Sequence, residues 1–178
     1  MQTLELTILN WIQAQCRSGF LDALMPAVSA LCAHGEIWIV LAAVLLIFPR
    51  TRRVGGILAA ALILDVICCN GILKPLIARV RPCDVNPAAE LLVRRPSDWS
   101  FPSGHAASSF AATAALYAAG CRGWIPAFAL SLLICFSRLY LYVHWPSDVL
   151  AGAILGVVLG FLAQKLYDKV AKKMKKTL

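Results

Sequence analysis

Charged residues are scarce in this sequence of 178 residues: only 15% are Asp, Glu, Lys or Arg, whereas 60% are hydrophobic. Soluble domains carry about 25% charged and roughly 45–50% apolar residues. The apolar residues form long blocks separated by short polar segments, which is typical of helices that cross a bilayer. The scarcity of charge therefore excludes an ordinary soluble domain and predicts one all-α integral membrane protein domain.

Cysteine spacing of the kind that binds zinc or builds a disulfide framework is also missing. The seven cysteines are odd in number, and no CxxC pair occurs among them. Most lie inside apolar runs, so we interpret them as small packing residues. The N-terminus lacks a charged region and a cleavage site, so no removable signal peptide is expected.

The apolar blocks predict a bundle of five to six transmembrane helices over residues 20–167. An N-terminal amphipathic interfacial helix (1–19) precedes it, and a basic cytoplasmic tail (168–178) follows it. Expected spans are 36–49, 54–73, 103–119, 124–142 and 146–167. Residues 20–33 are short for a span and Pro26 interrupts them, so the sequence is compatible with either a span or a re-entrant helix.

Small residues indicate where these helices pack closely. The span at 103–119 is rich in Ala, Ser and Thr, and Gly152, Gly156 and Gly160 recur every four residues along the last span. Faces of this kind let helix backbones approach each other in lipid. We therefore expect the glycines to form a helix contact and not a ligand site.

Three polar segments interrupt the apolar pattern. The first runs from Lys74 to Pro82, the second is Pro-Ser-Gly-His at 102–105, and the third runs from Arg138 to Asp148. Because each span reverses the direction of the chain, the three segments are predicted to lie at one membrane face. A helix is expected to start near Pro146, since proline suits the first turn.

The opposite face receives positive charge: Arg50, Arg52, Arg53, Arg122 and the lysines of the C-terminal tail. Positive charge at span ends marks the cytoplasmic side, so the polar segments should face outward and the C-terminus should be cytoplasmic. The cations on the outer side (Lys74, Arg79, Arg81, Arg94 and Arg95) are interpreted as engaged in a site. No aromatic residues interleave with the tail lysines, so we expect anionic membrane lipids and no nucleic acid as partners.

The cations of the polar segments predict a phosphate site. Lys74, Arg81 and Arg138 would repel one another in one pocket unless an anion lay between them. Arginine presents a fork that matches phosphate oxygens, and lysine adds a point charge. Ser103 and Gly104 would add a hydroxyl and backbone N–H donors at a helix N-terminus.

Two histidines then divide the chemistry. His144, oriented by Asp148 one helical turn away, can attack phosphorus and form a phosphohistidine. His105 can protonate the leaving oxygen and later activate water. Because the partners are Arg and Lys and not a crowd of carboxylates, no metal and no cofactor is expected.

Single residues of this set also have structural interpretations. Asp148 could be a helix N-terminal acid, His105 a cap, and Arg81 and Arg138 side chains that reach the membrane interface. Asp65, inside the second span, is compatible with a structural or a catalytic role. Only the combination at one membrane face points to catalysis.

The three motifs resemble those of the type 2 phosphatidic acid phosphatase superfamily. They are Lys-x6-Arg-Pro at 74–82, Pro-Ser-Gly-His at 102–105 and Ser-Arg-x5-His-x3-Asp at 137–148, and the resemblance covers roughly residues 20–167. It implies a helical bundle, typically with six transmembrane helices, that acts without metal. It also implies the same roles: a phosphate site formed by Lys74, Arg81, Ser103, Gly104 and Arg138, His105 as general acid, His144 as nucleophile and Asp148 as its partner.

By that resemblance we expect a lipid phosphatase in the bacterial inner membrane that converts undecaprenyl pyrophosphate to undecaprenyl phosphate. A phosphatidylglycerol-phosphate or phosphatidate phosphatase is the near alternative. A non-catalytic lipid-binding or transport protein, and a vanadium-dependent haloperoxidase, are remote ones. The sequence predicts no particular oligomeric state.

Overall fold

A computed structural model describes residues 2–177 of the chain, with side chains described as far as Met174. All regular structure in this range is helical, as expected for an all-α protein. The elements are α1 (Gln2–Cys16), α2 (Gly19–Ala30), α3 (Glu36–Ile47), α4 (Arg52–Asp65), the π-helix η1 (Val66–Leu73), α5 (Lys74–Ile77), α6 (Pro82–Val85), α7 (Gly104–Ala118), α8 (Trp124–Tyr140) and α9 (Pro146–Thr177).

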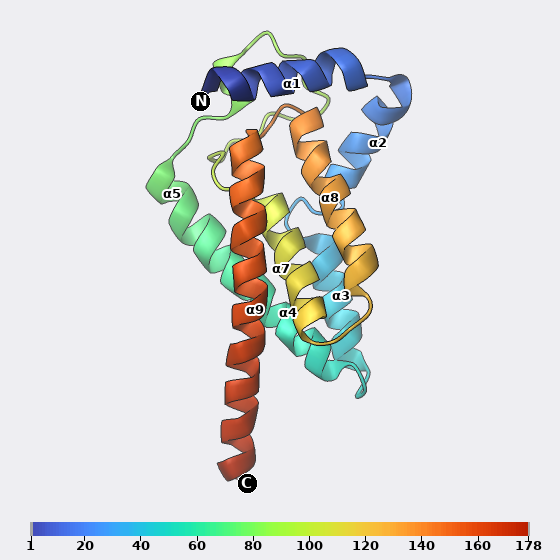
Figure 1. Cartoon of the computed structure of the whole chain (residues 1–178), viewed down its shortest axis with the longest axis vertical. Helices are drawn as coiled ribbons and strands as arrows, with labels where there is room; N and C mark the ends of the chain where they lie inside the picture. Colours follow the sequence, from blue (N-terminus) through green and yellow to red (C-terminus); the bar gives the residue numbers. More distant parts are fainter. Residues whose placement is uncertain (1, 178) are drawn as a thin grey trace.

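Helix α7 lies in the middle of the bundle and packs against α4, α8 and α9 (Figure 1). Its small side chains make this possible, because alanine lets neighbouring backbones come close on every side. Ala106, Ala107, Ala111 and Ala115 are all completely buried. The helix that begins with the Pro-Ser-Gly-His motif is therefore the core element of the fold.

The contact between α7 and α9 depends on the three regularly spaced glycines. A Cβ atom built on Gly156 would lie 2.3 Å from the carbonyl oxygen of Ala107, and one built on Gly152 would lie 2.5 Å from that of Ser103. Gly160 faces the Cβ of Ala114 in the same way, at 2.6 Å. The predicted close helix contact is confirmed, and it fixes the start of α9 against the start of α7.

Among the described residues, two stretches are long and apolar enough to cross a membrane: Arg52–Val85 and Pro146–Met174. Helices α2, α3 and α8 are apolar but shorter. Figure 1 shows that α2 and α3 follow each other along the bundle, which favours one broken traverse over a separate re-entrant segment. The five to six transmembrane helices remain a prediction.

Helix α1 lies across the end of the bundle at which α8 ends and α9 begins (Figure 1). Leu9 and Ile12 are buried against the protein, whereas Leu4 and Trp11 are more than half exposed. The polar side chains of an amphipathic interfacial helix are usually exposed to water, but Glu5 is only 7% exposed. One acidic residue of α1 is therefore part of the protein interior.

Two unusual backbone conformations shape the end of the bundle beneath α1. Ala78 ends α5 with φ of 47°, and Tyr142 turns the chain between α8 and α9 with φ of 60°. Positive φ is uncommon for residues other than glycine. The hydroxyl of Tyr142 donates to Oδ1 of Asn10 at 2.8 Å, which ties this turn to α1.

Candidate active site

The three polar segments meet at the end of the bundle that α1 covers. The guanidinium of Arg81, from the first segment, donates to the carbonyl of Val143 at 2.6 Å, and its Nη1 lies 3.1 Å from Nε2 of His144. The N–H of Ser103, from the second, donates to the carbonyl of Asp148 at 3.0 Å. Both contacts end on the third segment, so the predicted convergence is observed.

His144 lies in the turn between α8 and α9 and is 1% exposed. Since a guanidinium only donates hydrogen bonds, the contact with Arg81 assigns Nε2 as the acceptor and places the ring proton on Nδ1. Burial, together with the charges of Arg81, Arg138 and Lys74, holds the pKa of His144 well below its usual range. The ring is therefore neutral, with a lone pair on Nε2, as a nucleophile requires.

Asp148 stands in the first turn of α9, which begins at Pro146 as predicted, and is completely buried. Its Oδ2 accepts from the hydroxyl of Ser100 and from the N–H of Trp145 at 3.0 Å. Its Oδ1 accepts from Nη1 of Arg79 at 2.6 Å. The Nδ1 of His144 lies 3.6 Å from Oδ2, beyond hydrogen-bond range. The two side chains are neighbours, but other donors hold the carboxylate.

The predicted phosphate-binding cations Lys74 and Arg81 share one carboxylate. Asp98, in the loop before α7, accepts from Nζ of Lys74 and, at 2.7 Å, from Nη2 of Arg81. Partial burial opposes ionisation of Asp98, but the hydrogen bond from Lys74 and the two positive charges outweigh it and lower its pKa to about 2. The two cations are thus arranged to hold two oxygens of a single anion.

Arg138 and His105 are also at this end of the bundle. Arg138, in the last turn of α8, is 6% exposed and donates from Nη1 to the hydroxyl of Ser29. Its Nε, the Nε2 of His105 and the Nδ1 of His144 are buried and have no hydrogen-bond partner among the described residues. Buried polar atoms usually have partners, so a concentration of exceptions on predicted site residues is informative.

Ser103 and Gly104 shape the helix start. The hydroxyl of Ser103 accepts from the N–H of Ala106 at 3.5 Å, as an N-cap does, and Ser103 is completely buried. A Cβ added at Gly104 would meet Oδ1 of Asn70 at 3.4 Å. In this arrangement the Ser103 hydroxyl is engaged with the helix, so its predicted contact with phosphate remains a prediction.

Sequence reasoning assigned no role to Asp98, Ser100 and Glu5, and it expected Arg79 at a site without naming its partners. Asp98 bridges two of the cations, Ser100 and Arg79 bind Asp148, and Glu5 binds Arg79. The length and polarity of the loop before α7 were a signal for Asp98 and Ser100, since idle connections are shorter. Arg95, which was expected at a site, pairs instead with Asp84 at 2.7 Å.

Comparison with known proteins identifies the family to which this chain belongs. Residues 54–172 match the PAP2 superfamily. The undecaprenyl-diphosphatase of Sulfolobus acidocaldarius is 38% identical over 132 residues, which cover 73% of this chain and 63% of that protein. The chain therefore spans less than two thirds of this relative.

Two solved structures extend the likeness over nearly the whole chain. The crystal structure of Aquifex aeolicus LpxE superimposes with a TM-score of 0.78 and 28% identity, covering 91% of this chain and 95% of that one. The transmembrane PAP2 type phosphatidylglycerolphosphate phosphatase of Bacillus subtilis gives 0.76 and 25% identity, covering 95% and 87%. The chain belongs to the PAP2 superfamily.

Proposed function

We propose that this protein is a membrane lipid phosphatase that hydrolyses a lipid pyrophosphate or phosphate through a phosphohistidine on His144. The observation that carries the proposal is the 3.1 Å contact between Nη1 of Arg81 and Nε2 of His144. An anion that takes over this N–H of Arg81, while also bound by Lys74, would bring its central atom beside the freed lone pair of Nε2. Attack on phosphorus then needs no large movement of either side chain.

In the first step Nε2 of His144 attacks phosphorus, the bond to the leaving oxygen breaks, and His105 gives that oxygen a proton. Nδ1 keeps its proton, so the phosphorylated ring is cationic, and the carboxylate of Asp148 at 3.6 Å favours that charge. In the second step water attacks the phosphorus and passes a proton to His105. Inorganic phosphate leaves and His144 returns to its neutral form.

The cations supply the electrostatic part of catalysis. Lys74, Arg81 and Arg138 bind the oxygens of the transferring group, and the N-terminus of α7 at Ser103 and Gly104 adds a positive dipole end. In this scheme the unpartnered Nε of Arg138 donates a hydrogen bond to the transferring group, and the unpartnered Nε2 of His105 carries the proton. No step uses a metal ion or a cofactor.

The proposed substrate is undecaprenyl pyrophosphate, which would be converted to undecaprenyl phosphate. The support is the likeness to a protein named undecaprenyl-diphosphatase. The likeness in fold to a phosphatidylglycerolphosphate phosphatase keeps that glycerolipid as the second candidate. The phosphate-binding residues contact a group that both lipids share.

The proposed setting is a cell membrane that the chain crosses several times, with the site facing outward and the C-terminus in the cytoplasm. Arg50, Arg52, Arg53 and Arg122 lie at the turns opposite the site, and the positive-inside tendency assigns that end to the cytoplasm. Helix α1 would lie in the outer interface with Leu4 and Trp11 toward lipid.

Trapping the covalent intermediate tests the mechanism. Purified protein is mixed with a lipid pyrophosphate that carries a labelled terminal phosphate, in the presence of excess chelator, and is denatured at alkaline pH. The wild type should carry label on His144, and His144→Ala should carry none. Equal labelling of both proteins, or turnover by the variant, would contradict the assignment of His144 as the nucleophile. A wild type that takes up no label and releases no phosphate would favour a non-catalytic lipid-binding role for this chain.

A further inference from the structure

Arg79 joins the N-terminal helix α1 to Asp148, the carboxylate next to His144. Arg79 donates from Nη2 to Oε2 of Glu5 at 2.6 Å and from Nη1 to Oδ1 of Asp148 at 2.6 Å. Its guanidinium carbon also lies 5.1 Å from the centroid of the Trp145 ring. Arg79 is therefore fixed on three sides, and its two nitrogens connect carboxylates that are far apart in sequence.

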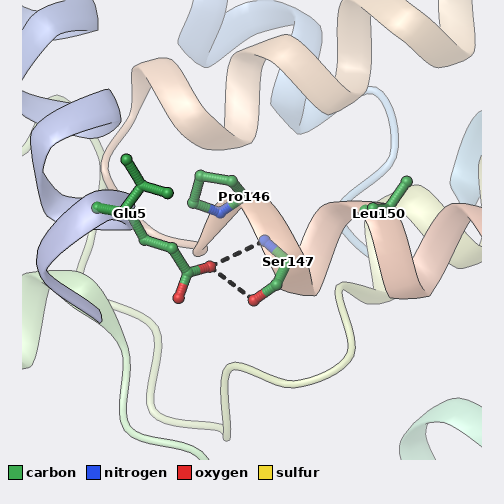
Figure 2. A pocket seen from close by; sticks show the side chains of 5 residues that line it. Glu5, Pro146, Ser147 and Leu150 are labelled. Carbon is green, nitrogen blue, oxygen red and sulfur yellow. Dashed lines mark hydrogen bonds between the residues drawn. The ribbon is translucent and has the colours of Figure 1, made fainter. Parts of the chain in front are cut away.

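Glu5 contributes more than one bond to this arrangement. Its Oε1 accepts from the N–H of Ser147 at 3.0 Å and from the hydroxyl of Ser147 at 2.6 Å, as Figure 2 shows. The first N–H groups of a helix have no partner within the helix, so Glu5 satisfies one of them at the start of α9. The same hydroxyl accepts from Nη1 of Arg79 at 2.6 Å. Glu5, Arg79 and Ser147 are therefore all hydrogen-bonded to one another, and Arg79 connects them to Asp148.

Burial of the charged groups in this cluster costs free energy unless each group keeps its partners. Glu5 is 7% exposed, and carboxylates are rarely buried without partners. Burial alone would raise the pKa of Glu5, but the bonds from Ser147 and Arg79 outweigh it and hold the pKa below its usual value. Glu5 is therefore ionised, and its charge offsets that of Arg79.

We propose that Glu5 and Arg79 are positioning residues for Asp148, through which the N-terminal helix sets the orientation and effective charge of the carboxylate that faces His144. Arg79 occupies Oδ1, which leaves Oδ2 on the side of Nδ1 of His144. Without Glu5, the positive charge of Arg79 would largely cancel that of Asp148. With Glu5, the three groups together carry one negative charge. This inference rests on the proposed phosphatase function.

The negative charge next to Nδ1 of His144 affects the ring strongly because most of the other groups near the ring are cations. The groups that act on His144 are Arg81, Lys74, Arg138, Asp98 and His105, besides Asp148 itself. Nothing in that set except Asp98 and Asp148 is an acid. The net negative charge of the Glu5–Arg79–Asp148 group is thus a main influence that favours a cationic, phosphorylated ring.

A purely structural role for α1 makes a different prediction, because other bonds also hold this helix. Asn10 accepts from the hydroxyl of Tyr142, and Nε2 of Gln13 donates to the carbonyl of Tyr140 at 2.6 Å. If α1 only covers the bundle, loss of one of these bonds should cost as much activity as loss of Glu5. Asn10→Ala is therefore the matched control.

The test measures kcat, KM and thermal stability of the full-length protein with a polyprenyl pyrophosphate. Glu5→Gln keeps the shape and removes the charge, so kcat should fall roughly 10-fold with KM within about 2-fold, as for other residues that orient a reacting group. Asn10→Ala should keep kcat within about 2-fold. The effect of Glu5→Gln should disappear in an Arg79→Gln background, since Glu5 acts through Arg79.

The pH profile separates positioning from folding. Arg79→Gln leaves the carboxylates of Glu5 and Asp148 without their cation. The midpoint of the acid limb in the pH profile of kcat/KM should therefore rise by roughly one pH unit. Wild-type kcat in a folded Glu5→Gln protein, or an equal loss in Asn10→Ala, would overturn the inference. A wild type that releases no phosphate, or a fully active His144→Ala, would instead overturn the proposed function.

Discussion

Nδ1 of His144 and Oδ2 of Asp148 are 3.6 Å apart, and Oδ2 is already occupied by the hydroxyl of Ser100 and the N–H of Trp145. The carboxylate is therefore held by bonds that do not depend on His144. Such a carboxylate is in place before the ring becomes charged, so little reorganisation accompanies phosphoryl transfer.

Asp148→Asn should abolish most activity while the protein remains folded. The amide keeps the volume but removes the charge next to Nδ1, and it leaves Arg79 facing a neutral group. We expect kcat to fall at least about 100-fold, since loss of the orienting acid in a serine protease costs about 10⁴-fold. Asp168→Asn is the control, because Asp168 pairs with Arg53 far along α9. Equal activities of the two variants would contradict the role of Asp148.

Asp98→Asn should strengthen inhibition by phosphate and vanadate. In the free protein the Asp98 carboxylate occupies Lys74 and Arg81, so an incoming anion has to displace it. Removal of its charge should lower the inhibition constants several-fold. The matched control is Asp84→Asn, since Asp84 is another exposed acid, paired with Arg95. Unchanged or weaker inhibition in Asp98→Asn would show that Asp98 does not compete with the anion.

The competition by Asp98 should not depend on pH above about 4. A lowered pKa of about 2 means that the folded protein keeps this carboxylate ionised wherever the free side chain, with a pKa near 3.9, is ionised. Its contribution to stability is fully present above about pH 4 and is lost as the pH falls through 2. Inhibition constants for vanadate measured from pH 5 to 8 should therefore show the same ratio of wild type to Asp98→Asn.

Gly156→Ala should destabilise the protein. The added Cβ would lie 2.3 Å from the carbonyl oxygen of Ala107, so α7 and α9 would have to separate. Overpacking of this kind costs about 1–3 kcal/mol, and a lower midpoint of thermal unfolding in detergent should report it. Gly19→Ala meets nothing within 4 Å and should leave the midpoint unchanged. Equal midpoints for both variants would contradict the packing described for α9.

Ala88→Cys tests which side of the membrane the site faces. Ala88 is exposed in the loop before α7, and Arg122 is exposed at the opposite end of the bundle. A thiol reagent that does not cross membranes should label Ala88→Cys in intact cells, above the wild-type background, and should label Arg122→Cys only after lysis. The reverse pattern would place the site in the cytoplasm.

Much of the fold and the approximate site follow from the sequence, because their signals are local and repeated. Apolar blocks indicate the helices, and the glycine repeat indicates the α7–α9 contact. The spacing of His144 and Asp148 around Pro146 predicts a carboxylate one turn from an imidazole. The residues that carry each of these patterns are close together in the chain or repeat along one helix.

The supporting contacts could not be predicted, because they join residues far apart in the chain. Glu5 on an amphipathic helix looks like a solvated acid, and only the folded chain brings it to Ser147, 142 positions later. Asp98 sits in a loop without periodicity, so its side chain has no predictable direction. The Ser103 hydroxyl had two possible partners, a helix N–H and a phosphate, and the spacing alone did not distinguish them.

Phosphate release by the purified protein tests the central claim most directly. Undecaprenyl pyrophosphate, phosphatidylglycerol phosphate and phosphatidate are compared with excess chelator present and with His144→Ala as control. The account predicts release that persists with chelator, disappears in His144→Ala and is fastest with the polyprenyl substrate. Release that survives in His144→Ala, or that requires a divalent metal, would contradict it, and faster release from a glycerolipid would overturn the substrate assignment alone.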